Sequence, residues 1–247
     1  MIDGLYAAAN GMYAQQGMID NVANNLANIS TPAYKGGRRS FQDLLYQQQG
    51  PNRAVAGGSV GAGAAGVSLG LSMTQGAISA TGNPLDLAIE GPGFFQVGLA
   101  DGTTGLYRGG MFRLDANRRL VTPEGNLLVP SITIPANVPT DQIAVSATGV
   151  VSYGTQNLGK ITLANVPAPE NLEALGGSLY RVTATSGAIT TAPGGVGVIQ
   201  SGAQEGSNVD TAAETSLLIQ AQRTYDLCSR AVRTWDEMLQ TANGIRR

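Results

Sequence analysis

The sequence predicts an α+β protein in which long N- and C-terminal helices form a coiled coil and flank a central, mainly antiparallel β domain. Three observations support this fold class. Apolar residues recur at helical spacing at both ends, and short β-branched runs between turn residues fill the middle. The chain also contains 34 Gly and 11 Pro but only 4 Phe and 1 Trp, which favours many turns and short strands.

The first expected element is a helix from about Asp3 to Ile29, roughly 40 Å long. We expect it to stop near Ser30 and Thr31, because Pro32 disfavours helical geometry at the residue before it and cannot donate a helical hydrogen bond. The apolar stripe of this helix repeats every seven residues, with Val22 at an intermediate position, and consists of Leu5, Met12, Ile19 and Leu26.

Four asparagines, Asn21, Asn24, Asn25 and Asn28, interrupt this pattern, and asparagine is a mediocre helix former. One interpretation is a frayed, solvated helix end. The other is a set of amides that hydrogen-bond to neighbouring chains and fix their register, as buried polar residues do in coiled coils.

The C-terminal helix shows the strongest periodic signal in the chain. Spacings of four and three connect Leu217, Ala221, Thr224, Cys228, Ala231, Trp235, Met238, Ala242 and Ile245. A neighbouring stripe consists of Leu218, Tyr225, Val232 and Leu239. The apolar face is therefore wider than a two-helix seam, which predicts more than one neighbour and hence assembly. Ser207–Asp210 and Thr211–Glu214 both have the spacing of a helix start, and the end is expected near Asn243 and Gly244.

Short β-branched runs between the helices predict the strands of a compact β domain. The expected strands are Leu85–Ile89, Phe94–Leu99, Ile132–Ile134, Ile143–Val145, Val150–Tyr153, Lys160–Val166 and Ser178–Thr183. The expected hairpin corners are Asp101-Gly102, Glu124-Gly125-Asn126 and Thr148-Gly149.

The segment from Gln47 to Gly70 has too little bulky apolar surface to order alone, which is typical of a linker or an arm awaiting a partner. The expected division of the chain is an N-terminal helix at 1–35, a Gly/Ala/Gln-rich linker or extended arm at 36–75, a central β domain at 76–204 and a C-terminal helix at 205–247. The two terminal helices together would form one helical core domain.

Composition excludes several functions. A net charge of −2 and a pI near 5.1 provide no cationic field for nucleic acid, and no apolar run approaches the length that direct membrane insertion needs. The first ten residues lack the basic and apolar regions of a cleavable signal peptide. The absence of His removes His-based acid–base catalysis and His-ligated metals, so we expect no enzyme, no catalytic residue and no metal site.

Two glycine-rich motifs do not change this expectation. Gly61–Gly66 fits the dinucleotide fingerprint, but Val67, Leu69, Leu71 and Met73 alternate like a strand where that motif needs a helix. Gly57–Gly61 fits the nucleophile-elbow pattern, but its serine has no histidine base. We therefore expect no cofactor. Cys228 lies on the apolar stripe, which favours a small buried thiol over a reactive one.

Three stretches resemble the flagellar rod and hook proteins, and they follow the family's order along nearly the whole chain. They are ANNLANISTPAYKG (Ala23–Gly36), EGPGFFQV (Glu90–Val97), and EGSNVD (Glu205–Asp210) followed by QAQRTYD (Gln220–Asp226). Chain length and the PSITIPAN segment (Pro130–Asn137) look most like the distal-rod branch, with proximal-rod and hook subunits as alternatives. The chain departs from the family at Ala33, where a glycine is usual, and at Cys228, where a polar residue is more frequent.

The resemblance implies a structural subunit of the bacterial flagellar basal body that polymerises into a helical tube, with the tube serving as drive shaft and export channel. It also implies type III export without a cleaved signal, and a location across the periplasm or cell wall. The implied partners are further copies of the chain, other rod and hook subunits, the flagellar ring proteins and the export machinery. A secreted, non-enzymatic binding or adhesion module remains the alternative of a different class.

The residues expected to form the polymerisation interface are the two helical stripes and three of the asparagines. On the N-terminal helix they are Leu5, Met12, Ile19, Val22, Asn24, Asn25, Leu26 and Asn28. On the C-terminal helix they are Leu217, Leu218, Ala221, Tyr225, Cys228, Ala231, Val232, Trp235, Met238 and Leu239.

Overall fold

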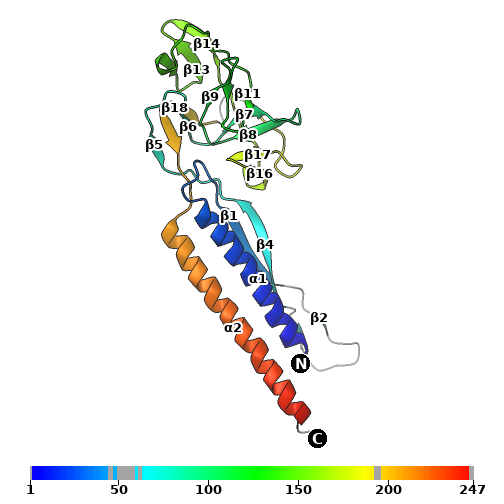
Figure 1. Ribbon diagram of the computed structural model, residues 1–247. Helices are drawn as coiled ribbons and strands as arrows, with labels where there is room; N and C mark the ends of the chain where they lie inside the picture. The colour runs from blue at the N-terminus through cyan, green and yellow to red at the C-terminus, as the bar shows by residue number, and fades with distance from the viewer. Residues whose placement is uncertain (1, 44–46, 49–58, 61–62, 192–195, 245–247) are drawn as a thin grey trace. The chain divides into compact units, whose positions relative to one another are not determined.

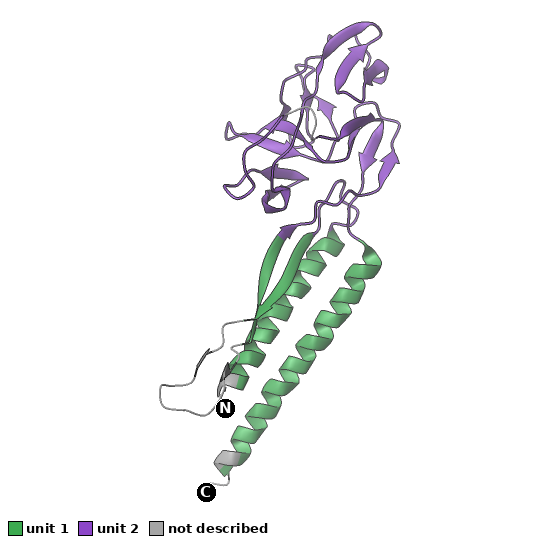
Figure 2. Ribbon diagram, turned by 180° about the vertical axis from the view of Figure 1, so that it is seen from behind, with its two compact units in different colours: residues 1–27, 37–69, 210–247 green, residues 28–36, 70–209 purple. Residues whose placement is uncertain are grey.

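The computed structural model describes residues 2–43, 47–48, 59–60, 63–191 and 196–244. The chain forms two compact units, shown in green and purple in Figure 2. The helical unit consists of Met1–Ala27, Gly37–Leu69 and Asp210–Arg247. The β unit consists of Asn28–Gly36 and Gly70–Val209. Each unit is therefore assembled from segments that are far apart in the sequence.

The helical unit is built on two antiparallel helices, α1 (Ile2–Ala27) and α2 (Thr211–Gly244), which lie side by side in Figure 1. Both form where the sequence predicts a helix. Their pairing follows a seven-residue step in opposite directions. A Cβ added at Gly4 would lie 3.2 Å from the Trp235 ring, and one added at Gly11 would lie 3.3 Å from Cys228 Sγ. Glycine on α1 thus leaves space for the larger side chains of α2.

The helix ends follow local hydrogen bonding. α1 ends two residues earlier than expected, and a turn follows in which Thr31 N–H donates to Asn28 O at 3.0 Å. At the start of α2, Asp210 is the capping residue, because its Oδ1 accepts from Ala212 N–H at 2.8 Å. α2 is helical through Gly244, and the residues after it lie outside the described part of the chain, so the predicted end near Asn243 and Gly244 stays a prediction.

A two-stranded ribbon of β1 (Gly37–Asp43) and β4 (Ala64–Leu71) belongs largely to the helical unit. Between these strands, β2 (Gln47–Gln48) pairs with β3 (Ser59–Val60). The ribbon approaches α1 closely, since a Cβ added at Gly63 would lie 3.1 Å from the Ala7 Cα. β4 confirms the strand pattern after the glycine fingerprint, whereas Gly61, Ala62 and the elbow residues Gly57 and Gly58 lie outside the described residues.

The β unit contains one large antiparallel sheet in the order β16-β17-β8-β7-β11-β10-β9, with β15 paired to β7. Its strands are β7 (Phe94–Gly98), β8 (Thr104–Tyr107), β9 (Arg113–Leu114), β10 (Leu120–Val121), β11 (Leu127–Leu128), β15 (Leu163–Ala164), β16 (Glu173–Gly176) and β17 (Leu179–Arg181).

Smaller antiparallel sheets and two short 3₁₀ helices complete the β unit. The three-stranded sheet consists of β12 (Ile143–Val145), β13 (Val150–Tyr153) and β14 (Gln156–Lys160). The two-stranded sheets are β18 (Val198–Ser201) with β6 (Leu87–Glu90), and β19 (Ala203–Glu205) with β5 (Ile78–Ala80). The 3₁₀ helices are η1 (Thr140–Gln142) and η2 (Pro169–Asn171).

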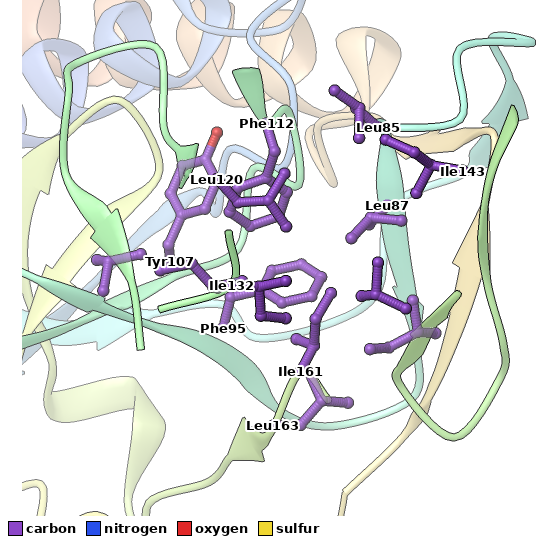
Figure 3. Close-up of a cluster of buried hydrophobic side chains, with 14 of the residues drawn as sticks. Leu85, Leu87, Phe95, Tyr107, Phe112, Leu120, Ile132, Ile143, Ile161 and Leu163 are labelled. Atoms are coloured by element: carbon purple, nitrogen blue, oxygen red, sulfur yellow. The ribbon is translucent and has the colours of Figure 1, made fainter. Parts of the chain in front are cut away.

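Two apolar clusters cover the two faces of the large sheet. Phe94 and Phe95 are neighbours in β7 and therefore point to opposite faces. Phe95 joins the larger cluster, where its ring contacts Phe112 edge-on at 5.1 Å between centroids (Figure 3). Phe94 joins the smaller cluster and contacts Tyr180 at 5.8 Å. The two adjacent aromatic residues of the EGPGFFQV stretch thus pack on opposite faces of the sheet.

Most predicted strands form, with small shifts at their ends. The single strand predicted at Lys160–Val166 is wrong, because β14 ends at Lys160 and pairs with β13, whereas Leu163–Ala164 forms β15 and pairs with β7. Ile143–Val145 and Val150–Tyr153 match their predicted bounds, and all three predicted hairpin corners connect antiparallel strands. The strand predicted at Ile132–Ile134 is wrong, since this segment makes only an isolated bridge between Thr133 and Arg119. Its isoleucines are nevertheless buried, at 3% and 1% exposure, so burial and not pairing explains its apolar character.

The structure confirms an α+β fold with terminal helices and an antiparallel β unit. The expected division of the chain at residues 35, 75 and 204 stays a prediction. The two compact units described above are each built from separate segments of the chain. In the described part of the chain, no helix combines the length and apolar content that crossing a bilayer requires.

Candidate functional site

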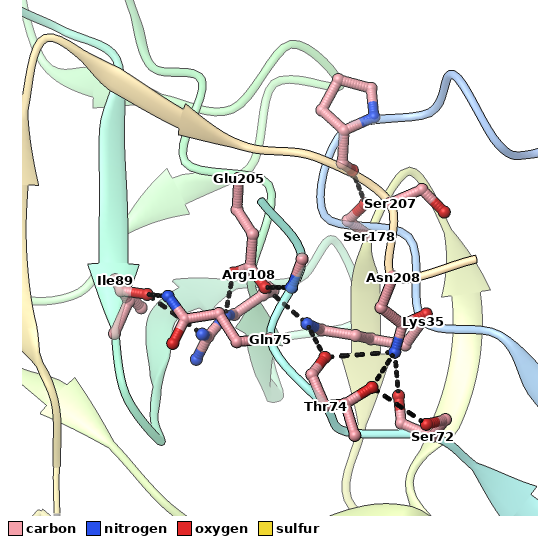
Figure 4. Close-up of polar contacts among 12 residues, drawn as sticks. Lys35, Ser72, Thr74, Gln75, Ile89, Arg108, Ser178, Glu205, Ser207 and Asn208 are labelled. Atoms are coloured by element: carbon pink, nitrogen blue, oxygen red, sulfur yellow. Dashed lines mark hydrogen bonds and ion pairs between the residues drawn. The ribbon is translucent and has the colours of Figure 1, made fainter. Parts of the chain in front are cut away.

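A buried cluster of charges lies within the β unit (Figure 4). Glu205, at the end of β19, is 1% exposed, and its two carboxylate oxygens bind different cations. Lys35 Nζ donates to Oε1 at 2.6 Å, and Arg108 Nε donates to Oε2 at 2.7 Å. Gly76 N–H also donates to Oε1, at 2.9 Å. We call Lys35, Arg108 and Glu205 the charge cluster.

Backbone carbonyls around Arg108 accept most of its remaining donors. Its Nη2 donates to Ile89 O at 3.1 Å and to Gly91 O at 2.9 Å, and its Nη1 donates to Gly93 O. Gly91 and Gly93 have φ values of +100° and +132°, which only glycine adopts without strain. The glycines of the EGPGFFQV stretch therefore shape a carbonyl lining for the guanidinium group.

Asn208 extends this network. Its Oδ1 accepts from Gly36 N–H at 2.9 Å, while its Nδ2 donates to Ser72 O at 2.7 Å. Together with the charge cluster, these bonds bring all three signature stretches into contact. Lys35 and Gly36 come from the first stretch, Gly91 and Gly93 from the second, and Glu205 and Asn208 from the third.

The electrostatics of the charge cluster depend on burial and on mutual neutralisation. Burial by itself would raise the pKa of Glu205, but Arg108 and Lys35 hold this pKa below its ordinary value. Burial lowers the pKa of Lys35, and the contact with Glu205 opposes that shift only in part. Two buried cations share a single carboxylate, so the loss of Glu205 would leave two uncompensated charges away from water.

A pocket of about 290 Å³ borders the charge cluster in the β unit. Lys35 and Arg108 line it together with the apolar side chains Met73 and Phe94. In the described part of the chain, no group of three His, Cys, Asp or Glu side chains is placed to hold a metal ion.

Ala33 lies two residues before Lys35 and adopts a left-handed backbone conformation, which residues with a Cβ disfavour. Its φ is +52°, it is fully buried, and its N–H donates to Glu205 O at 2.8 Å. The glycine usual in the resembled family would adopt this conformation without strain. Ala33 is therefore a strained residue in this turn.

The predicted interface residues of the helical unit fall into three groups. Val22, Asn25 and Ala221 are buried within the unit, at 1%, 2% and 3% exposure. The half-buried residues are Met12, Ile19, Leu26, Leu218, Tyr225, Cys228, Val232 and Trp235. The exposed residues are Leu5, Asn24, Leu217, Ala231, Met238 and Leu239. Asn28 belongs to the β unit and is half-buried.

The asparagine amides have partners within the chain. Asn25 Nδ2 donates to Gly37 O at 3.1 Å and to Glu214 Oε1 at 3.0 Å, and its Oδ1 accepts from Gly37 N–H. Asn21 Nδ2 also donates to Gly37 O, at 2.9 Å. Asn25 thus joins β1 and α2 to α1, and the interpretation of a frayed, solvated end is wrong at this residue.

Sequence periodicity missed two sets of residues. Lys35, Arg108 and Glu205 were not singled out, although two of them lie inside the signature stretches. Among exposed large apolar side chains, Tyr6, Tyr13, Ile219 and Leu227 are 65%, 85%, 51% and 64% exposed. The large apolar stripe residues Leu5, Leu217, Met238 and Leu239 are 36%, 38%, 49% and 46% exposed. Tyr6, Tyr13, Ile219 and Leu227 lie outside the positions that the three-and-four spacing selected, so a projection of every side of each helix would have revealed them.

The fold and these surfaces define a structural protein, with a pair of terminal helices that expose apolar side chains and a β unit held by a buried charge cluster. Three family models match the chain. "Flagella basal body rod protein" matches residues 5–35, "Flagellar hook protein FlgE/F/G D1 domain" matches 88–153, and "Flagellar basal body rod FlgEFG protein C-terminal" matches 200–245.

Full-length relatives agree with these models. The chain is 38% identical to the flagellar basal-body rod protein FlgG of Borreliella burgdorferi, with all of both chains covered. It is 39% identical to FlgG of Caulobacter vibrioides, covering 99% of this chain and 100% of the relative, and 33% identical to FlgG of Bacillus subtilis over all of both chains. The chain belongs to the flagellar basal-body rod protein family and is a structural subunit of the flagellar rod.

Proposed function

We propose that this subunit polymerises through its helical unit into a helical tube, which forms the distal rod and acts as drive shaft and export channel. The observation that supports this most directly is the exposure of large apolar side chains along both helices, including Tyr6, Tyr13, Ile219 and Leu227. Such surface on a soluble chain marks an interaction site.

The predicted stripes would contribute to this assembly in two ways. Buried and half-buried members such as Ala221 and Trp235 would hold α1 and α2 together as a coiled coil, consistent with their seven-residue register. Exposed members such as Leu217 and Met238 would contact other copies. At about 25 cal/mol per Å², several hundred Å² of apolar surface per helix would contribute on the order of 10 kcal/mol before ordering costs.

Family membership supports assembly with other flagellar rod and hook components at the basal body. The finer parts of the proposal are passage across the periplasm or cell wall, type III export without a cleaved signal, and contacts with the ring proteins. In a polymer each helix pair would touch several neighbours, so slippage under torque would expose many apolar side chains at once.

The test compares the full chain with the fragment 28–209, which lacks both helices. Sedimentation velocity and negative-stain electron microscopy over a concentration series should show tubes or protofilaments for the full chain and monomers for the fragment. Circular dichroism of the full chain should show helicity that rises on assembly. Polymers of the fragment would contradict the proposal, and full helicity of a dilute, non-assembling monomer would favour a binding or adhesion module.

A further inference from the structure

Helix α1 has one side that neither α2 nor the β1–β4 ribbon covers. Gly4 and Gly11 face α2, and Ala7 and Ala14 face the ribbon near Gly63 and Gly66. Tyr6 and Tyr13 are seven residues apart, so they share a side of the helix, and they are 65% and 85% exposed. No charged residue occurs between Gly4 and Ile19, and the next charge on this side is the exposed Asp20, seven residues after Tyr13.

A groove of about 220 Å³ lies elsewhere on the same helical unit. Its apolar walls are Met18 of α1, Phe41 of β1, and Leu217 and Ala221 of α2. The other lining residues are Gln15, Gln220 and Thr224, which are all neutral. This chemistry suits a side chain that combines an apolar ring with a hydroxyl group, because the ring replaces water against the walls and the hydroxyl meets an amide.

Tyr13 cannot fill the groove of its own chain. Met18 follows Tyr13 by five residues, which places the two about 140° apart around α1. A projecting side chain and a matching groove on different sides of one unit produce a head-to-tail contact between copies. Such a contact repeats into a ring or an open helical filament, and the filament is the form that the proposed tube requires.

The outer side of α2 is a poorer match for the groove. Arg223, Asp226 and Arg230 are exposed there, and a charge placed in a neutral groove would lose its hydration without gaining a partner. The part of α1 around Tyr6 and Tyr13 carries a smaller cost, because the nearest exposed charge on that side, Asp20, lies about 10 Å further along the helix.

We propose that Tyr13 of one copy inserts into the Met18–Phe41–Leu217–Ala221 groove of a second copy, with Tyr6 packing at its edge. This inference rests on the proposed polymerisation and identifies the surfaces that carry it. These surfaces are distinct from the contact between α1 and α2, where Cys228 and Trp235 face the glycines of the same chain.

The first experiment measures the critical concentration for polymerisation of full-length variants. Tyr13→Ala should raise it at least tenfold, whereas Tyr13→Phe, which keeps the ring, should stay within about threefold of the parent. Leu175→Ala is the matched control, since it removes another exposed apolar side chain outside the helical unit and should change nothing. The circular dichroism spectrum of dilute Tyr13→Ala should equal that of the parent, because Tyr13 makes little contact within the chain.

The second experiment is a disulfide cross-link in the full chain. In a Cys228→Ser background, Tyr13→Cys combined with Gln220→Cys is polymerised above the raised critical concentration that loss of the ring predicts. Oxidation should then give a ladder of covalently linked copies, and each single cysteine should give none above dimer. The inference would be overturned if the parent chain and Tyr13→Ala polymerised equally well and the double cysteine gave no ladder. That result would leave the proposed function intact. A parent chain that never polymerises would overturn both.

Discussion

At the scale of single residues, Glu205 should matter most to the β unit. Replacing it by glutamine would remove the carboxylate that pairs with both Lys35 and Arg108 and leave both cations buried. Breaking such a buried pair from one side costs about 3–5 kcal/mol. Urea unfolding should show this loss for Glu205→Gln, while Asp115→Asn, which breaks the more exposed pair with Arg119, should shift the transition far less. Equal shifts would contradict a special role of the charge cluster.

The same carboxylate should make the β unit sensitive to acid. The folded-state pKa of Glu205 lies below its ordinary value of 4.5, so its stabilising contribution is complete above that pH and is lost as the pH falls below it. The difference in unfolding free energy between the parent and Glu205→Gln should therefore be largest near neutral pH and shrink towards pH 3. A difference that stays constant from pH 7 to pH 3 would show that the charge of Glu205 is not what stabilises the fold.

Ala33 offers a test of backbone strain. Replacing a buried alanine by glycine in a regular strand costs roughly 1–2 kcal/mol through lost burial and added chain entropy. At Ala33 the relief of left-handed strain, about 1–2 kcal/mol, should offset that cost and make Ala33→Gly nearly neutral. Ala88→Gly in β6 is the matched control, because Ala88 is also buried, at 1% exposure, and lies in a regular strand. Similar losses in both variants would mean that Ala33 is not strained.

At the scale of elements, the α1–α2 seam can be tested at Gly11. Alanine there should gain up to about 1 kcal/mol in helix propensity, but its Cβ would press against Cys228 Sγ at 3.3 Å. We therefore expect Gly11→Ala to be nearly neutral alone and stabilising in a Cys228→Ala background. Thermal unfolding followed at 222 nm measures this double-mutant cycle, and purely additive effects would show that the two residues are not in contact.

The elements differ in how well the sequence predicts them. Both helices were predictable because their apolar spacing persists over many turns, and hairpins such as that at Thr148-Gly149 were predictable from local turn chemistry. Ile132–Ile134 was not, since a short apolar run is equally compatible with a strand and with a buried loop. The side of α1 that carries Tyr6 and Tyr13 was missed because the search followed one stripe and aromatic residues on another side do not extend it.

At the scale of the whole molecule, the charge cluster could not be deduced from periodicity. Glu205 binds partners that are 170 and 97 residues away in the sequence, and no local pattern connects such positions. The resemblance found the three stretches but not the reason that they occur together. The structure supplies that reason for the β unit, because Lys35, the carbonyls of Gly91 and Gly93, and Glu205 complete one network.

This network determines where the chain can be cut. The fragment 28–209 keeps Lys35, Arg108, Glu205 and Asn208 and should unfold cooperatively, as followed by urea titration of its near-ultraviolet circular dichroism. The fragment 76–204, which follows the boundaries expected from composition, retains the larger apolar cluster but leaves Arg108 buried without its carboxylate. It should be less stable by at least about 3 kcal/mol. Glu205→Gln within 28–209 isolates the contribution of the charge from that of the missing chain, and equal stability of all three fragments would mean that the apolar core alone holds the β unit together.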